Sequence, residues 1–391
     1  MESGNDRLQS RIRGIVFGTS YGDAIGAVVE KLSFKEIKDK YGLVTNLNQK
    51  WYKHDWAPEL RNYRVRGEGT ITDDTLMTLA LMEVYNVEKR HIDSYDMGKE
   101  FVKEIAFKPR YIPEFKKEAL IIDRLFYPEK HIFLRHTLAN CDPRQGGIGN
   151  MVNCGAAMYI APIGIVNAGN PGAAYNEGIN FAMGHQISYG LEAAGVLAAC
   201  VAKAIIPGTK IEEVIETAII HAKDGTKKAI EKIYEKALEI KEKREDYDSI
   251  VKEFHEVIKE FSPMGDDVNR SIDKLGIPSD HYTPSRLYSI EELPLALGFI
   301  VVYDGDFKKS MIAGINSGRD TDSIGVMIGA ILGAMYGETI INDEELKILE
   351  ETSKQKLLEN SDKFYKTAKE IIENDFIAEQ KRRTDISKIF I

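Results

Sequence analysis

The sequence predicts an all-α fold in a single multi-helix domain, and three observations support this prediction. Apolar residues recur at helical spacing, or strong helix formers dominate, along most of the 391 residues. The alternating pattern typical of strands is nearly absent. No Gly/Ser-rich or Pro-rich linker divides the chain, so one domain spanning residues 1–391 is expected. The predicted helices are, in chain order, 9–30, 73–89, 92–106, 171–183, 190–206, 210–222, 225–262, 290–303, 321–336 and 343–374.

Three segments depart from this helical background or stand out within it. Residues 45–70 and 107–150 carry the Trp, Tyr, Pro and Gly that indicate long loops, and long ordered loops often line a site. Residues 222–260 are rich in Lys and Glu at spacings that support solvated helix faces, which favours an exposed helical hairpin. We therefore expect residues 225–285 to form a helical insertion.

Two of the predicted helices have a glycine at every fourth position. A glycine inside a helix costs about 0.5–1 kcal/mol relative to alanine, so eight of them need a reason. Residues four apart form one ridge on a helix, and a ridge of glycines lets another backbone approach closely. Both helices are therefore expected at the centre of the fold, where each packs tightly against its neighbours. The two helices could also pack against each other. The glycines are Gly14, Gly18, Gly22 and Gly26 in the first helix, and Gly325, Gly329, Gly333 and Gly337 in the second.

Composition and charge exclude several classes of function. The formal net charge is −9 and the isoelectric point about 5.6, so no basic surface predicts nucleic-acid binding. The three cysteines form no CxxC pair, which fits a reducing cytoplasm. The N-terminus has no apolar signal segment, and the longest uncharged apolar run, 323–337, is shorter than the roughly 20 residues of a membrane span. We expect a cytoplasmic protein with no nucleic-acid or membrane partner.

Oxygen-bearing side chains are concentrated at the starts of two predicted helices. Either cluster alone fits an N-cap, because Asp, Thr and Ser oxygens accept free backbone N–H groups there. Together they supply more acceptors than two caps need, and four converging carboxylates would repel one another without a cation. Oxygen ligands suit Mg²⁺ or Mn²⁺, so a site for two divalent cations is the alternative prediction. The clusters consist of Thr72, Asp73 and Asp74, and of Asp320, Asp322 and Ser323.

Two further acids lie near the end of the first predicted helix. Asp23 and Glu30 are seven residues apart, which places them on one helix face. Asp23 lies among small residues and is either a buried hydrogen-bonding acid or a contributor to the site. Glu30 closes the helix and could reach a site at its end.

Several of these motifs, in this order, resemble the ADP-ribosylglycohydrolase family. The resemblance rests on GDAIGAVVE (22–30), TDDT (72–75) and NSGRDTDS (316–323), and landmarks extend over about residues 12–337. It also covers NCGAAMYIAPIG (153–164), GHQISYGLEAAGVLAACVAKAI (184–205) and the segment 292–316. The resemblance implies a single orthogonal multi-helix domain with loop and helical insertions, and a hydrolase that releases ADP-ribose from an ADP-ribosylated protein or from a small ADP-ribosyl or ribosyl metabolite.

The resemblance also implies roles for particular residues. It implies a binuclear Mg²⁺ or Mn²⁺ centre, with Glu30 where relatives carry a mobile glutamate. Hydrolysis at the anomeric carbon needs an acid or a base, and we expect Glu30 or Asp322 to serve, without assigning which. The implied metal ligands are Thr72, Asp73, Asp74, Asp320, Asp322 and Ser323, and the implied substrate-binding residues are Asn153, Cys154, Gly155, Met158 and His185.

The sequence departs from the family pattern at Ser323, which is often threonine there and keeps the hydroxyl, and at three further positions. Cys154 stands where the family commonly has asparagine, Tyr159 where it has arginine, and Arg319 where many relatives have a second glycine. These departures leave a second hypothesis open, a hydrolase of a smaller ribosyl N-glycoside such as a nucleoside. A third hypothesis is a non-enzymatic helical protein, in which the metal ligands would be expected to decay.

Overall fold

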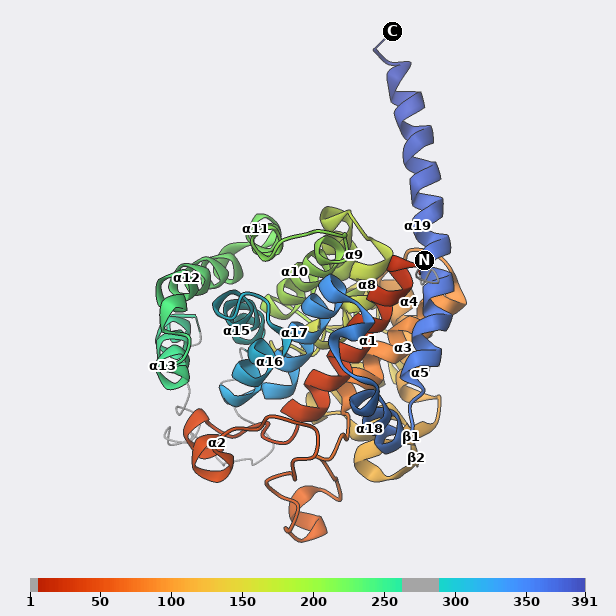
Figure 1. Ribbon diagram of the computed structural model, residues 1–391. Coiled ribbons are helices and arrows are strands. Elements are labelled where there is room, and N and C mark those ends of the chain that lie inside the picture. The colour runs from red at the N-terminus through yellow and green to blue at the C-terminus, as the bar shows by residue number, and fades with distance from the viewer. Residues whose placement is uncertain (1–5, 262–287, 391) are drawn as a thin grey trace.

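The computed structural model describes residues 6–261 and 288–390. Helices account for 69% of these described residues and strands for 3%, so the predicted all-α class is confirmed. Figure 1 shows the helices gathered around a central pair, with the end of the last helix projecting from the body. The longer helices are α1 (Arg7–Gly26), α2 (Phe34–Tyr41), α3 (Asp73–Glu88), α7 (Tyr127–Leu138), α9 (Pro171–Ala182), α10 (Tyr189–Ala204), α11 (Ile211–His221), α12 (Asp224–Ile240), α13 (Tyr247–Ile258), α15 (Tyr288–Val302), α16 (Phe307–Asn316), α17 (Thr321–Tyr336), α18 (Asp343–Ser353) and α19 (Leu357–Ser387).

The remaining elements are short. One antiparallel hairpin pairs β1 (Arg110–Ile112) with β2 (Lys117–Ala119), with Tyr111 opposite Glu118. The short helices are α4 (Ser94–Asp96), the π-helical η2 (Met97–Phe101), α5 (Val102–Ala106), α6 (Ile121–Arg124), α8 (Ala161–Val166), η1 (Pro58–Arg61), η3 (Pro113–Phe115), η4 (Pro143–Gln145), η5 (Ala157–Tyr159), η6 (Lys241–Lys243) and η7 (Glu338–Ile340).

The two glycine-ridged helices pack against each other in opposite directions at the centre of the fold. A Cβ atom added to Gly18 would lie 2.4 Å from the carbonyl oxygen of Gly329, and one added to Gly22 would lie 2.2 Å from that of Gly325. Such close backbone approach is available only without side chains, so the expected packing role of the glycines is confirmed. Since the helices are antiparallel, the C-terminal end of α1 lies beside the start of α17 (Figure 1).

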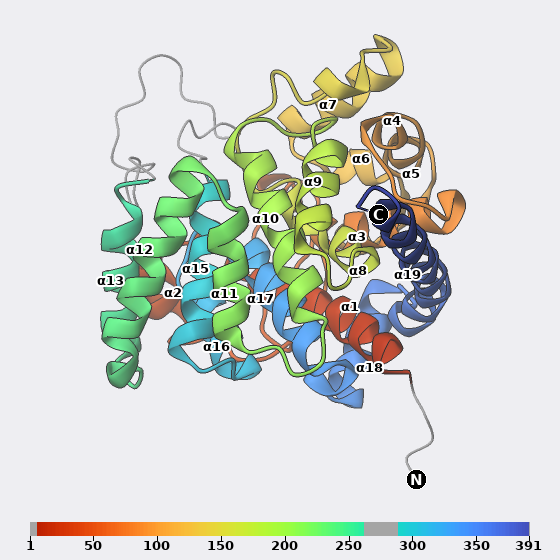
Figure 2. The same ribbon diagram turned by 90° about the horizontal axis from the view of Figure 1, so that it is seen from above.

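Other helices enclose this pair. Helices α10, α15 and α16 pack on α17, whereas α3, α18 and α19 pack on α1. Helices α8, α9 and α11 cover α10, and α12 and α13 form an outer layer over α15, as Figure 2 shows from above. A continuous hydrophobic core runs through these helices, and α17 is buried over nearly its whole length.

The first helix ends four residues earlier than the pattern 9–30 predicted. The Thr321 hydroxyl donates a hydrogen bond of 2.8 Å to the Gly26 carbonyl, and the Val29 N–H reaches the same oxygen at 3.0 Å in a tighter turn. A continued α-helix would need that carbonyl for residue 30. Glu30 therefore lies in a turn after the helix, and the expectation that it shares a helix face with Asp23 is wrong.

Three other boundary predictions are wrong for local reasons. The single helix predicted over 225–262 is divided into α12 and α13 within the described residues, because Asp246 accepts a bond from the Ser249 N–H and caps the new helix α13. Residues 343–374 likewise split at Lys354, whose φ of 53° is left-handed, and α19 then continues to Ser387. The loop predicted at 107–150 contains the hairpin, α6 and α7. Pro128 in the first turn of α7 was the available signal for that helix.

Some predictions on organisation are not tested. Residues 225–261 are helical and lie on the outside, but residues 262–285 of the expected insertion lie outside the described residues. The single domain spanning 1–391 and the insertion therefore stay predictions. None of the helices in the described part of the chain is both long and apolar enough to cross a membrane.

Candidate metal centre

The two acidic helix starts meet in the interior. The Ser323 hydroxyl at the start of α17 donates a hydrogen bond of 3.1 Å to Asp74 Oδ2 at the start of α3. All six side chains of the two clusters belong to buried residues, with no more than 9% of any of them exposed. The structure thus brings together the residues that the sequence predicts as metal ligands, although their roles stay predictions.

Asp23 fixes the start of α3 from the neighbouring helix α1. Its carboxylate accepts bonds from the Thr72 N–H at 2.9 Å, the Thr75 N–H at 3.1 Å and the Thr75 hydroxyl at 2.5 Å. Burial raises the pKa of Asp23 to about 6, and these hydrogen bonds oppose the rise. Of the two roles left open for Asp23, the contacts show the buried hydrogen-bonding acid.

Helix capping accounts for part of the two clusters. Thr72 is the N-cap of α3, where its hydroxyl accepts from the Asp74 N–H at 3.4 Å. Asp320 occupies the N-cap position of α17, but its side chain caps no backbone N–H group of that helix. Capping therefore explains Thr72 and leaves the Asp320 carboxylate available for another role.

Backbone contacts hold the turn after α1 against the loop before α17. The Lys31 N–H donates to the Arg319 carbonyl, and the Arg319 N–H donates to the Leu32 carbonyl, both at 2.9 Å. This places Glu30 beside the second cluster. Glu30, Asp320 and Asp322 each offer one carboxylate oxygen, and these atoms lie within 4.8 Å of one another.

A second group of donors shares Asp320. Cys154, Glu292 and Asp320 are all buried, and one ligand atom from each lies within 4.8 Å of the others. Sequence reasoning placed Cys154 in a substrate loop and missed Glu292. The signal was the pair of adjacent acids, Glu291 and Glu292, at the start of the predicted helix 290–303, because buried carboxylates are rare unless they have a partner.

The sequence analysis did not identify two arginines whose side chains are buried. Arg66 forms ion pairs with Glu30 and, at 2.7 Å, with Glu114. Arg124 forms ion pairs with Asp73 and with the same Glu114. The arginines come from the segments 45–70 and 107–150, so the expectation that these segments border a site agrees with their positions. They balance part of the negative charge of the acidic cluster.

The electrostatics of the cluster fit a divalent cation. The pKa of Asp74 lies well above its usual range, because of burial and then because of the nearby carboxylates Asp23, Asp73 and Asp320. The pKa of Asp322 is raised in the same way by burial, Glu30, Asp320 and Asp74. Crowded buried carboxylates of this kind hold protons unless a cation neutralises them. Carboxylates with hydroxyls are also the donors that Mg²⁺ and Mn²⁺ prefer.

The predicted substrate loop is tied to a hydrogen-bond network next to the cluster. The Gly155 N–H donates to Asn153 Oδ1 at 2.9 Å, and Asn153 Nδ2 donates to Glu129 Oε1 at 3.3 Å. His185 is fully buried, contacts Glu129 and lies 2.9 Å from the Tyr159 hydroxyl. Met158 is also buried. Among the five residues predicted to bind substrate, Cys154 is the one that joins the acidic cluster, and the binding roles stay predictions.

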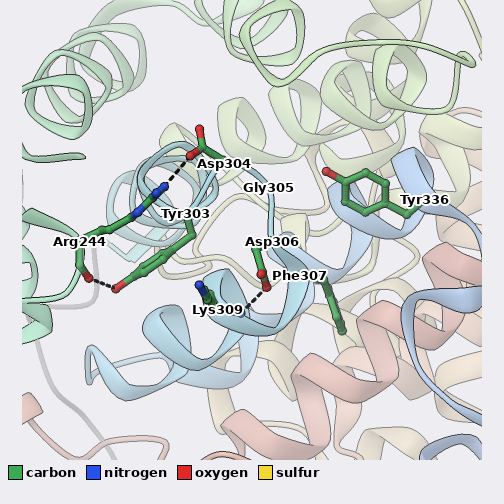
Figure 3. Close-up of a pocket in the computed structure, with 8 residues that line it drawn as sticks. All are labelled: Arg244, Tyr303, Asp304, Gly305, Asp306, Phe307, Lys309 and Tyr336. Carbon is green, nitrogen blue, oxygen red and sulfur yellow. Dashed lines mark hydrogen bonds and ion pairs between the residues drawn. The ribbon is translucent and has the colours of Figure 1, made fainter. Parts of the chain in front are cut away.

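A surface pocket lies at the far end of α17 from the acids. Its volume is about 440 Å³, and Tyr336, the last residue of α17, lines it together with Tyr303 and Arg244 (Figure 3). Arg244 forms an ion pair of 2.6 Å with Asp304. Because the acids lie at the first turn of the same helix, this pocket is separate from the acidic cluster.

Comparisons with known proteins agree with this architecture. The sequence model of the ADP-ribosylglycohydrolase family matches residues 4–376, so the chain belongs to that family. ADP-ribosylhydrolase ARH3 of Gallus gallus is 25% identical over 335 residues, which are 84% of this chain and 86% of that protein. ARH3 of Homo sapiens is 24% identical over 354 residues, 85% and 87% of the two chains.

Two other comparisons extend the likeness. An uncharacterised protein of Archaeoglobus fulgidus is 26% identical over 331 residues, 84% of this chain and 88% of that protein. A solved structure described as an ADP-ribosylglycohydrolase-related protein complex is similar in fold, with a TM-score of 0.60 at 18% identity. The alignment covers 93% of this chain and 99% of that one. The family resemblance and the fold predicted from the motifs are confirmed.

Proposed function

We propose that this protein is a metal-dependent hydrolase that cleaves the N- or O-ribosyl bond of an ADP-ribosylated substrate and releases ADP-ribose. One observation carries the proposal: the starts of α3 and α17 supply carboxylates and hydroxyls to one buried cluster, in which Ser323 and Asp74 are 3.1 Å apart. Family membership and the named ARH3 relatives support the same reaction class.

The cluster has the donors for two divalent cations, Mg²⁺ or Mn²⁺. Glu30, Asp320 and Asp322 would hold one cation, and Asp74, Ser323 and Asp320 would hold the other. When bound, such cations supply Lewis-acid chemistry: they orient neighbouring sugar hydroxyls and lower the pKa of a water molecule.

The residues of this chain perform the remaining tasks. Glu30 is 11% exposed at its side chain, and Arg66 pairs with it, which holds the carboxylate at the edge of the cluster. Burial, followed by the carboxylates of Glu30, Asp320 and Asp74, raises the pKa of Asp322, which is the direction that favours a proton donor in glycoside hydrolysis. Either carboxylate can therefore assist the leaving group or take a proton from water.

A smaller ribosyl N-glycoside, such as a nucleoside, is the second candidate for the substrate, and one observation favours it. Tyr159, which stands where the family commonly has arginine, is fully buried and lies 2.9 Å from His185 Nδ1. A buried tyrosine held in this way supplies no positive charge for a diphosphate. This departure favours a substrate with less negative charge than ADP-ribose.

A substrate panel tests the proposal. Peptides carrying ADP-ribosyl-serine or ADP-ribosyl-arginine, ADP-ribose 1″-phosphate and free nucleosides are incubated with protein in Mg²⁺, Mn²⁺ or EDTA. We expect release of ADP-ribose that requires the cation and is lost in Asp320→Asn. The matched control is Asp304→Asn at the distant surface pocket, which should keep full activity. Turnover of nucleosides alone would support the second candidate, and turnover unaffected by EDTA would contradict the metal-dependent reaction.

A further inference from the structure

The sulfur of Cys154 lies among the oxygen donors of the candidate metal centre. Cys154 Sγ is 3.3 Å from Asp320 Oδ2 and 3.3 Å from Ser323 Oγ. The same sulfur forms a compact group with the carboxylates of Glu292 and Asp320. Its residue is 5% exposed, so this sulfur faces the cluster rather than solvent.

The two donor groups that share Asp320 differ in chemistry. One consists of oxygen donors alone, from Glu30, Asp320 and Asp322, whereas the other includes the thiol of Cys154. Oxygen-only sites suit hard cations such as Mg²⁺ and Mn²⁺, while a thiolate ligand selects softer ions such as Zn²⁺. Cys154 departs from the asparagine that the family resemblance implies at this position.

We propose that Cys154 is a thiolate ligand that makes one of the two cation positions selective for Zn²⁺-class ions, while the other position keeps its preference for hard cations. The inference rests on the proposed function for the presence of a cation centre, and it deepens that function by distinguishing its two positions. On binding, the S–H bond breaks, the proton leaves to solvent, and the sulfur electron pair forms the bond to the cation.

The observed spacing agrees with a shared ion. With Zn–S of about 2.3 Å and Zn–O of about 2.1 Å, sulfur and oxygen ligands of one ion are separated by about 3.1 Å at a right angle and about 3.6 Å at a tetrahedral angle. The 3.3 Å between Cys154 Sγ and Asp320 Oδ2 falls between these limits. Little movement is therefore needed for both atoms to bind one cation.

The other two cysteines provide matched controls. Cys200 is fully buried in α10, and its sulfur lies 4.0 Å from the Val214 carbonyl oxygen. Cys141 is partly exposed and lies 3.6 Å from His136 Nδ1. Neither belongs to a donor group of the centre. Cys200→Ser and Cys141→Ser therefore remove a thiol without touching the cluster.

The experiment uses Co²⁺ as a spectroscopic substitute for Zn²⁺ in the full-length protein. We expect a near-ultraviolet sulfur-to-cobalt charge-transfer band in the parent protein and in both control variants, and loss of that band in Cys154→Ser. Zn²⁺ affinity in Cys154→Ser should fall by roughly 10–100-fold or more, since even an outer partner of a ligand is worth that much. Mn²⁺ affinity should change far less. If the serine variant does not fold by circular dichroism, Cys154→Asn, the residue common in the family, replaces it.

The outcomes separate the inference from the proposed function. A band that persists in Cys154→Ser, or its absence in a parent protein that binds Co²⁺, would overturn the thiolate ligand and leave the oxygen-ligated hydrolase intact. Failure of the parent protein to bind Mn²⁺, Co²⁺ or Zn²⁺ would overturn the cation centre itself, and the inference with it.

Discussion

One of the close backbone contacts between α1 and α17 allows a quantitative prediction for Gly22→Ala. A Cβ atom at Gly22 would lie 2.2 Å from the carbonyl carbon and oxygen of Gly325, whereas ordinary contact begins at 3.4 Å. The two backbones must therefore separate by about 1.2 Å along this line. The atoms that the new methyl group meets belong to the backbone of a rigid helix, so no flexible side chain can move aside to make room.

The cost follows from the opposing effects of the added methyl group. Overpacking a tight core costs about 1–3 kcal/mol, and the rigid backbone contact places this site near the upper end of that range. Alanine regains about 1 kcal/mol of helix propensity over glycine. We therefore expect Gly22→Ala to lower the free energy of unfolding by about 2 kcal/mol. Because the separation occurs close to the start of α17, Mn²⁺ affinity should fall as well.

Urea unfolding followed by circular dichroism measures the first effect, and calorimetric Mn²⁺ titration measures the second. The matched control is Gly172→Ala in α9, where the added Cβ meets its nearest neighbour, His221 Cε1, at an ordinary 3.6 Å. That variant should be unchanged or more stable by about 0.4–1 kcal/mol. A Gly22→Ala protein as stable as the parent would refute the reasoning, because the ridges could then separate without cost.

Three further predictions concern the acidic cluster. Asp322→Asn should abolish release of ADP-ribose. The melting temperature of the cation-free protein should stay equal or rise, because asparagine resembles the protonated acid that the raised pKa favours. Near-normal turnover would show that Asp322 takes no part in the reaction. The folded protein binds more protons than the unfolded chain between pH 3.8 and the raised pKa values of Asp74 and Asp322, so without cations its free energy of unfolding should fall as pH rises through that window. Calorimetry should then show a Mn²⁺-induced rise in melting temperature that grows with pH, and a rise independent of pH would contradict the assignment. Arg124→Gln leaves Asp73 and Glu114 without this buried partner and should lower the free energy of unfolding in urea by about 3–5 kcal/mol. The control Arg244→Gln, whose pair with Asp304 is exposed, should lower it by about 1 kcal/mol or less. Equal losses in the two variants would show that the buried pairs contribute no more than an exposed pair.

The features that sequence analysis predicted are those that short local patterns encode. The glycine ridges are visible as a four-residue period, and their packing on each other follows from one physical rule. The acid clusters are visible because helix starts are marked by Thr72 and Asp320, and because each start has more acceptors than a cap needs. The family motifs then supplied the order and the wide spacing that neither cluster has alone.

The features that sequence analysis missed depend on tertiary contacts. Helix α1 ends at Gly26 because a hydroxyl from Thr321, far along the chain, binds its carbonyl. Arg66 and Arg124 lie in segments without periodicity, so nothing local shows that both pair with Glu114. Glu292 offered a signal as one of two adjacent acids in a mostly apolar helix, but its nearness to Cys154 and Asp320 appears only in the folded chain.

The glycine ridges and the acidic cluster depend on each other energetically. Glu30, Asp320 and Asp322 come from the adjoining ends of two antiparallel helices, and their like charges oppose that arrangement whenever no cation is bound. The close packing of α1 on α17 supplies the opposing free energy, because the helices cannot drift apart without losing contact along the whole ridge. The arginine pairs reduce the repulsion at the edge of the cluster. A chain that kept the acids but replaced the glycines would therefore lose the geometry of the centre before it lost any of the ligands.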